Sequence, residues 1–196
     1  PELRWMGYLS TVGVYGDHQG AWVNEETPCR PVSPRSLDRL AAEEEWQKLS
    51  RDIDTPLAIL RLSGIYGRGR NTFVNLADGT AKRIIKPGQF FNRIHVKDIA
   101  GAVLHLAKTE TGGIFNVTDD EPAPPQDVVS FAARLANMPM PPEISYDDAQ
   151  MSEMARSFYG EVKRVSNAKL RKSGYDLVYP NYRIALENMW KQHAWE

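Results

Sequence analysis

Three short apolar runs, separated by helical segments, constrain most strongly how this chain can fold. They are LRWMGYLS near the N-terminus, LAILRL at residues 57–62 and GIFNVTD at residues 113–119. Each run is apolar at successive positions, a pattern typical of strands that helices cover on both faces. Because strands and helices alternate along the chain, the sequence predicts a parallel α/β sheet. Three strands are few for such a sheet, so we expect the second half of a larger one.

Capping residues and apolar spacing mark the helices. Ser33 suits the N-cap and Pro34 the first helical position, so a helix is predicted from there onward. A short strand in FFNRIHV leads into a predicted helix over about residues 97–108, one face of which is apolar. PPQDVVSFAARLAN predicts a helix that ends near Asn137, before the breaker MPMPPE. Further helices are predicted at about residues 147–157, 166–172 and 182–193.

Charge balance and cysteine content exclude several classes of protein. With 24 lysines and arginines against 25 aspartates and glutamates, the formal net charge is −1, so no overall field favours nucleic acid or an anionic membrane. No apolar run approaches the roughly 20 residues of a membrane span, and no signal-peptide pattern is present. The single cysteine, Cys29, predicts a reducing, cytoplasmic setting. We expect no metal site, because the four histidines are scattered at His18, His95, His105 and His193.

Two arginines lie four residues apart in the helix that follows Ser33. On a helical wheel, Arg35 and Arg39 share one face with an alanine, a tryptophan and a leucine, so both faces of the helix are partly apolar. One interpretation is that the guanidinium groups extend into solvent or pair with Asp38 and Glu43. The other is a clamp for an anion or a ribose, because guanidinium groups suit phosphates and vicinal hydroxyls. The spacing alone leaves both interpretations open.

Several motifs occur in a recognisable order: YLSTVGVYGD, SPRSLDRLAAEE, LRLSGIYGRG, RIHVKDIAGAVL and GIFNVTDDEP. Together they resemble the extended short-chain dehydrogenase/reductase superfamily of the NAD-dependent epimerase/dehydratase type, from about residue 8 to residue 116. The resemblance implies the second half of a Rossmann-like parallel sheet, a partial NAD(P)-binding domain, over residues 1–117. A smaller, mostly helical substrate-binding lobe is expected over residues 118–196. The resemblance also implies a small-molecule substrate and a homodimer. In the homodimer, Leu37, Leu40 and Ala41 would form the helix face that packs against the partner.

The resemblance assigns catalytic roles by position. Thr11 stands where the superfamily has a Ser or Thr that hydrogen-bonds the reacting group. The superfamily's Tyr-x-x-x-Lys pair is replaced by Arg35 and Arg39. Because a guanidinium with a pKa above about 12 cannot shuttle protons near neutral pH, the usual chemistry is in doubt. If chemistry remains, Tyr15, Tyr66 or His95 would supply the proton. The chain looks like atypical members that keep the cofactor site and alter the catalytic pair.

The remaining predicted site residues follow the same motifs. For the cofactor we predict contacts from Arg39, Ser63, Gly64, Ile65 and Tyr66, and for the substrate contacts from Asn92, Arg93 and Arg156. Arg61 is predicted to be a structural ion-pair partner, and the acidic stretch at residues 119–121 a solvated turn. The cationic side chains at positions 156, 163 and 164 either hold a phosphate or are solvated helix charges.

The glycine-rich loop that this superfamily uses to bind pyrophosphate, T-G-x-x-G-x-x-G, is absent from the 196 residues. The stretch GIYGRGRN has a different order of glycines. We therefore expect NAD or NADP to be a cofactor of a complete protein of which this chain is a truncated part, inactive and binding dinucleotide weakly by itself. Two functions remain open: the C-terminal half of an NAD(P)-dependent oxidoreductase or epimerase/dehydratase-like enzyme acting on a nucleotide sugar or a similar small polar substrate, and a non-catalytic NAD(P)-binding sensor or scaffold.

Overall fold

A three-stranded parallel sheet forms the centre of the computed structural model, which describes residues 2–196. Its strands are β1 (Met6–Thr11), β3 (Leu57–Leu62) and β7 (Gly113–Val117), in the order β1-β3-β7. These are the three predicted apolar runs, and the α/β fold class is confirmed. Thr11 lies opposite Leu62, and Leu62 opposite Val117, so the carboxyl ends of all three strands meet at one edge.

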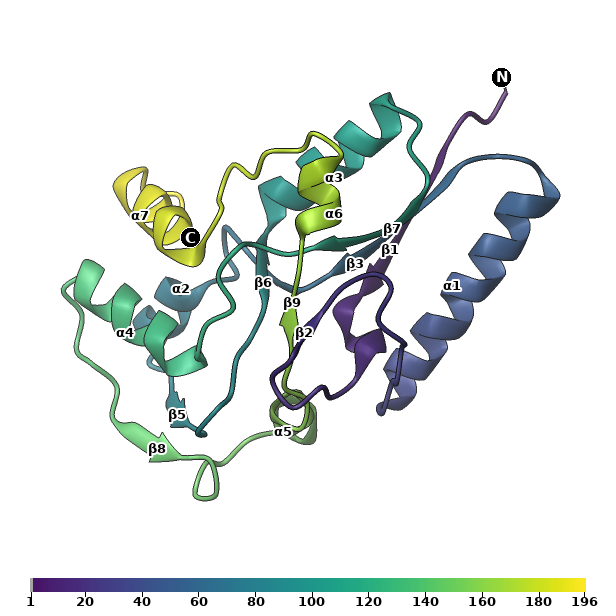
Figure 1. Cartoon of the computed structure of the whole chain (residues 1–196). Coiled ribbons are helices and arrows are strands. Elements are labelled where there is room, and N and C mark those ends of the chain that lie inside the picture. Colours follow the sequence, from purple (N-terminus) through teal and green to yellow (C-terminus); the bar gives the residue numbers. More distant parts are fainter. Residues whose placement is uncertain (1) are drawn as a thin grey trace.

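Two helices cover opposite faces of this sheet (Figure 1). Alternate residues of β3, Ala58 and Leu60, pack against α3 (Val96–Lys108) in the main apolar core. The next residue, Arg61, points the other way, where it pairs with Glu43 of α1 (Pro34–Asp52). The predicted helix over residues 97–108 is therefore confirmed within one residue. Every second side chain of a strand faces the same side, which explains this division.

α1 packs against the sheet through polar residues and not through the apolar residues that the helical wheel indicates. Its fully buried residues are the polar Ser36 and Glu43, whereas Leu37 is 52% exposed. The reason lies in the sheet, because the strand register places Ser10 next to Arg61 and so presents polar groups to the helix. Arg61 is the structural ion-pair partner that was predicted, and its partner is Glu43. A homodimer through residues 37, 40 and 41 of α1 stays a prediction.

Short parallel strand pairs connect distant parts of the chain. They are β2 (Trp22–Val23) with β9 (Arg164–Val165), β4 (Gly64–Tyr66) with β6 (Arg93–His95), and β5 (Arg83–Ile85) with β8 (Glu143–Ser145). The part after residue 118 is therefore less purely helical than predicted. Segments before residue 118 also pack with it, since β5 contacts α4 (Pro125–Leu135).

The other helices are short and mostly belong to the lobe. They are η1 (Val12–Tyr15), α2 (Thr72–Ala77), α5 (Glu153–Tyr159), α6 (Ala168–Lys172) and α7 (Tyr182–Lys191). α2, α4 and α7 enclose a second apolar core that includes Phe73 and Leu186, and they gather on one side of the molecule (Figure 1). α5 begins later than predicted, because a hydrogen-bonded turn from Ser145 to Asp148 precedes it. Within residues 2–196 no helix has the length and apolar character needed to cross a bilayer.

Candidate functional site

Thr11 is the last residue of β1 and stands at the carboxyl edge of the sheet. Its Oγ1 accepts a hydrogen bond of 3.1 Å from the backbone N–H of Gly13, which caps the 3-10 helix η1. This contact uses an acceptor lone pair only, and no described residue accepts the hydroxyl proton. The Thr11 hydroxyl can therefore donate to an oxygen atom of a ligand, at the edge where ligands of parallel α/β sheets bind.

Gly13 lets the start of α1 come close to Thr11. A Cβ atom added at Gly13 would lie 2.9 Å from Ser36 Oγ and 3.3 Å from Thr11 Oγ1. Ser36 is buried, and its hydroxyl accepts a 2.9 Å hydrogen bond from Ser33 Oγ. Two hydroxyl groups, of Thr11 and Ser36, thus flank the same glycine. Sequence reasoning missed Ser36, although its place three residues after the N-cap Ser33 was a usable signal.

The two arginines of α1 reach in different directions. Arg39 donates from Nη1 to the backbone oxygen of Leu9 at 2.7 Å, and its guanidinium lies 5.8 Å from the centre of the Tyr8 ring. Arg35 is exposed, with its guanidinium 5.5 Å from the ring of Phe158 in α5. Neither takes part in an ion pair within residues 2–196, so the pairing with Asp38 and Glu43 is wrong, whereas the exposure of Arg35 agrees with the alternative that it extends into solvent.

A buried polar network lies between α1 and the sheet near this edge. Arg61 donates from Nη2 to Glu43 Oε2 at 2.7 Å, and Ser10 Oγ donates to Glu43 Oε1 at 2.5 Å. The guanidinium of Arg61 lies 4.9 Å from the ring of Tyr15, whose hydroxyl donates to Asn116 Oδ1 at 2.8 Å. Because both charges of the pair are buried, removing either would leave the other uncompensated. The network therefore fixes α1 and η1 against the sheet.

Tyr15 has a packing role in the structure. Its side chain has no exposed surface, its hydroxyl is bonded to Asn116, and burial raises the pKa of that hydroxyl. A side chain in this position does not touch a ligand at the sheet edge. The hydroxyl of Tyr15 is therefore not open to a ligand, which disfavours the predicted catalytic role.

Three residues predicted to contact ligands brace the backbone. Ser63 Oγ donates to the oxygen of Val117 at 3.3 Å, and the N–H of Gly64 donates to the oxygen of Asn92. Both polar atoms of the Asn92 side-chain amide are hydrogen-bonded: Nδ2 donates to the Lys163 oxygen at 3.0 Å, and Oδ1 accepts from the Val165 N–H at 2.8 Å. Gly64 itself is exposed beside the end of β3. Of the three, Ser63 is buried, Asn92 is partly exposed with its amide already bonded, and Gly64 has the most exposed surface.

Four other predicted residues have packing or capping contacts of their own, and none is hydrogen-bonded to Thr11. Tyr66 and Arg93 line a small cavity in the lobe together with residues of α2, α4 and α7. Ile65 packs against the core beneath α3. His95 caps α3, with Nδ1 accepting from the N–H of Lys97 at 3.2 Å, and burial lowers the pKa of its ring.

The charged residues of the lobe divide into solvated and buried groups. Arg156 is exposed and donates to the Ala149 oxygen at 3.1 Å. Lys163 is buried, with its ammonium 2.6 Å from the Gly16 oxygen and 2.6 Å from a Glu161 oxygen, so solvation is wrong for this residue. Asp119 is also buried, so a solvated turn is wrong there, because the loop folds beneath β6, where the Asp119 N–H bonds the backbone oxygen of residue 93. Residues 2–196 contain no group of three or more acidic, histidine or cysteine side chains placed to hold a metal ion.

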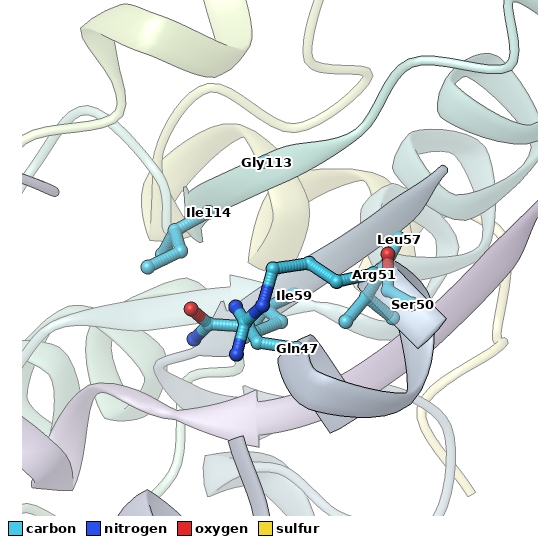
Figure 2. A pocket seen from close by; sticks show the side chains of 7 residues that line it. All are labelled: Gln47, Ser50, Arg51, Leu57, Ile59, Gly113 and Ile114. Atoms are coloured by element: carbon cyan, nitrogen blue, oxygen red, sulfur yellow. The ribbon is translucent and has the colours of Figure 1, made fainter. Parts of the chain in front are cut away.

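An open hollow of about 170 Å³ lies on the sheet face beside the end of α1. Figure 2 shows Gln47 and Arg51 extending from α1 over an apolar floor that includes Ile59 and Ile114. The hollow is lined by the first residues of β3 and β7, Leu57 and Gly113, and so lies at the opposite end of the strands from Thr11. It does not belong to the candidate site.

Comparison with known families agrees with this arrangement. A sequence model of the NAD dependent epimerase/dehydratase family matches residues 4–118, more than half of the chain. The chain belongs to this family. The match covers β1, α1, β3, α3 and β7, which are the elements that build the sheet and position Thr11 and Arg39. The resemblance inferred from the motifs is thereby confirmed.

Three known proteins show how far the similarity extends. Protein YeeZ of Escherichia coli (strain K12) is 34% identical over 151 residues, which are 68% of this chain and 47% of that protein. A conserved protein of unknown function from Silicibacter pomeroyi DSS is 48% identical, with a TM-score of 0.90, over 97% of this chain and 66% of that one. A human epimerase family protein solved with NADPH has a TM-score of 0.80 at 18% identity, over 97% of this chain and 66% of that one. At this identity the similarity supports the fold alone. The chain spans about half the length of the curated relative.

Proposed function

We propose that this chain supplies the substrate side of an NAD(P)-dependent oxidoreductase or epimerase/dehydratase-like protein that acts on a nucleotide sugar or a similar small polar compound. The observation that carries the proposal is the Thr11 hydroxyl, which has an unused proton at the carboxyl edge of the parallel sheet. In this position it would hydrogen-bond the reacting hydroxyl or carbonyl oxygen of the substrate. Membership of the epimerase/dehydratase family supports this role.

Arg39 fits the ribose end of a dinucleotide. Its Nη1 is occupied by the Leu9 oxygen, but Nε and Nη2 have no partner among the described residues. These nitrogens could donate to ribose hydroxyls or to a phosphate, and either NAD or NADP suits such a contact. The dinucleotide would supply the hydride chemistry, while Arg39 and Thr11 would orient the two reactants.

The pyrophosphate of the dinucleotide needs a glycine-rich loop that this sequence does not contain. We place that loop on polypeptide outside the 196 residues. Two observations support this: no strand of residues 2–196 pairs with the second edge of β1, and the relatives are longer. The isolated chain should therefore bind NADPH with a dissociation constant above about 10 μM.

Dinucleotide binding without turnover is a second candidate function. None of the predicted proton donors approaches Thr11 in a usable form: Tyr15 is buried and bonded, Tyr66 lies in the lobe cavity, and His95 caps α3. The lack of a proton donor beside Thr11 within residues 2–196 is the observation that supports a sensor or scaffold as the second candidate.

NADPH affinity of the full-length protein tests the role of Arg39. Arg39→Ala should weaken binding at least about tenfold, because a charged donor to the ribose or phosphate is lost. Arg51→Ala is the matched control, since Arg51 lies in the same helix beside the hollow at the other end of the strands. Equal affinities of the two variants would contradict the proposed contact.

Turnover separates the two candidate functions. Hydride exchange between labelled NADPH and a panel of sugar nucleotides, abolished by Thr11→Val, supports the enzyme. Tight NADPH binding without hydride exchange supports the non-catalytic sensor or scaffold. In the second case, Arg35→Tyr combined with Arg39→Lys restores the superfamily's usual pair, and any activity it creates would show that the site is otherwise intact.

A further inference from the structure

A small cavity lies where the lobe packs against β4, β6 and α2, and neither Thr11 nor Arg39 lines it. It has a volume of about 50 Å³ and lies among β4, β6, α2, α4 and α7. Its lining residues are Tyr66, Thr72, Arg93, Val128, Tyr182 and Leu186. The sheet and the dinucleotide proposal do not account for it, so its polar side chains need a separate explanation.

Polar atoms in and beside this cavity have no hydrogen-bond partner. The hydroxyl oxygens of Tyr66 and Tyr182 are buried, and so is Oδ2 of Asp119, yet none of them bonds to any atom of the described residues. Tyr182 and Asp119 are each only 1% exposed. Because buried polar groups in folded proteins are almost always hydrogen-bonded, several such orphans together indicate a polar occupant.

The cavity is also positively charged. Arg93 donates from Nη1 to the backbone oxygens of Phe91 and Ala123, at 2.9 and 3.1 Å, and takes part in none of the ion pairs of residues 2–196. Burial lowers the pKa of Arg93, but an arginine remains protonated in proteins. Burial raises the pKa of the nearby Asp119 to about 8, so this carboxyl is mostly neutral at pH 7 and does not balance the charge.

We infer that this cavity is a binding site for a small carboxylate anion of the size of acetate. The guanidinium fork of Arg93 suits two carboxylate oxygens, and the phenol groups of Tyr66 and Tyr182 are further donors. Val128 and Leu186 also line the cavity and offer apolar surface for a methyl group.

The volume agrees with an ion of this size. One buried water needs about 10–15 Å³ of such a cavity. A cavity of about 50 Å³ therefore has room for a few atoms of water size, which is the scale of a four-atom carboxylate and below that of a sugar. Arg93 is the charged residue of the lining, so an anion balances its charge whereas neutral water does not.

Thermal unfolding in sodium acetate, compared with sodium chloride at equal ionic strength and pH 7, tests the inference. Acetate should raise the unfolding temperature of the wild type saturably, because a ligand that binds only the native state stabilises it. Tyr182→Phe removes one donor without changing the shape of the cavity and should weaken acetate binding about threefold to tenfold. In chloride alone this variant should unfold no earlier than the wild type, since it also removes an orphan hydroxyl.

Tyr146→Phe is the matched control, because Tyr146 is a half-buried tyrosine of the lobe that does not line the cavity. It should bind acetate as the wild type does. Three results would overturn the inference: an equal response to chloride, no response to acetate, or equal weakening by the two tyrosine variants. Crystals grown in acetate that show only water between Arg93 and Tyr182 would also overturn it.

Discussion

Asp119 is a carboxyl group that the protein encloses on nearly every side. One of its oxygens accepts a hydrogen bond of 3.2 Å from the N–H of Glu121, and the other has no partner among the described residues. Burial raises its pKa to about 8; the Glu121 N–H and Arg93 oppose this, while the acidic neighbours Asp120 and Glu121 add to it. At neutral pH the native state therefore holds a proton that the unfolded chain has released.

This proton makes native stability depend on pH. Between about pH 4 and pH 8 the native state binds more protons than the unfolded state, so the free energy of unfolding falls as pH rises, by at most about 1.4 kcal/mol per pH unit. Asp119→Asn is neutral throughout and should remove this slope, which urea titrations in acetate-free buffers can measure. Asp120→Asn, at an exposed neighbour that adds least to the raised pKa, should keep most of it. Parallel curves for the wild type and Asp119→Asn would contradict the protonated carboxyl.

At the level of elements, the close contact between η1 and α1 depends on a glycine. A methyl group at Gly13 would lie 2.9 Å from Ser36 Oγ, and the two segments are otherwise held in place by the Glu43–Arg61 pair. Gly13→Ala should therefore destabilise the protein by about 1–3 kcal/mol, as overpacking does. Adding Ser36→Ala should recover part of that loss, because it removes the clashing oxygen.

A double-mutant cycle measures this coupling. The free energy lost in the double variant should be smaller than the sum of the two single losses by at least about 0.5 kcal/mol. Additive losses would show that Gly13 and Ser36 do not contact each other. Ser50→Ala is a control on the same helix, since Ser50 Oγ donates to the Thr55 oxygen and is far along α1 from Gly13. It should be additive with Gly13→Ala.

Elements with a regular apolar pattern could be predicted from the sequence, and elements whose packing depends on distant polar groups could not. The strands and α3 carry continuous or periodic apolar residues, so their place in the core follows from local pattern. α1 buries Ser36 and Glu43 and exposes Leu37, because Ser10 and Arg61 of the sheet supply partners that only the strand register reveals.

In the candidate site, too, residues in local motifs could be predicted and contacts between distant residues could not. Thr11 and Arg39 could be found because each lies in a motif of neighbouring residues, and the structure places both at the carboxyl end of β1. Sequence alone could not reveal the contact of Arg35 with Phe158 or the cavity beside Tyr66, because the contacting residues are far away in the sequence. The cavity around Tyr66 exists only once α2, α4 and α7 have packed together.

For the whole molecule, a buried carboxylate is one of the contacts that join the sheet and the lobe. Asp98 of α3 has no exposed surface, and its oxygens accept hydrogen bonds from the Tyr175 hydroxyl, the Val178 N–H and the Tyr179 N–H, at 3.0, 2.7 and 3.0 Å. These three donors belong to the segment that leads into α7, so Asp98 connects the main core with the lobe core. A carboxylate with three donors is a strong anchor.

Loss of this anchor should separate the unfolding of the lobe from that of the sheet. Asp98→Ala leaves three donors without an acceptor, at a cost of about 3 kcal/mol, and α7 loses its tie to α3. In native-state hydrogen exchange the amides of α7 should then exchange about a hundredfold faster, whereas the slowest amides of β3 should change much less. Asp176→Ala, whose side chain is 95% exposed, should leave both unchanged. If β3 and α7 lost equal protection in Asp98→Ala, the two layers would have to unfold as one unit, with their coupling spread over other contacts such as the Lys163–Gly16 hydrogen bond.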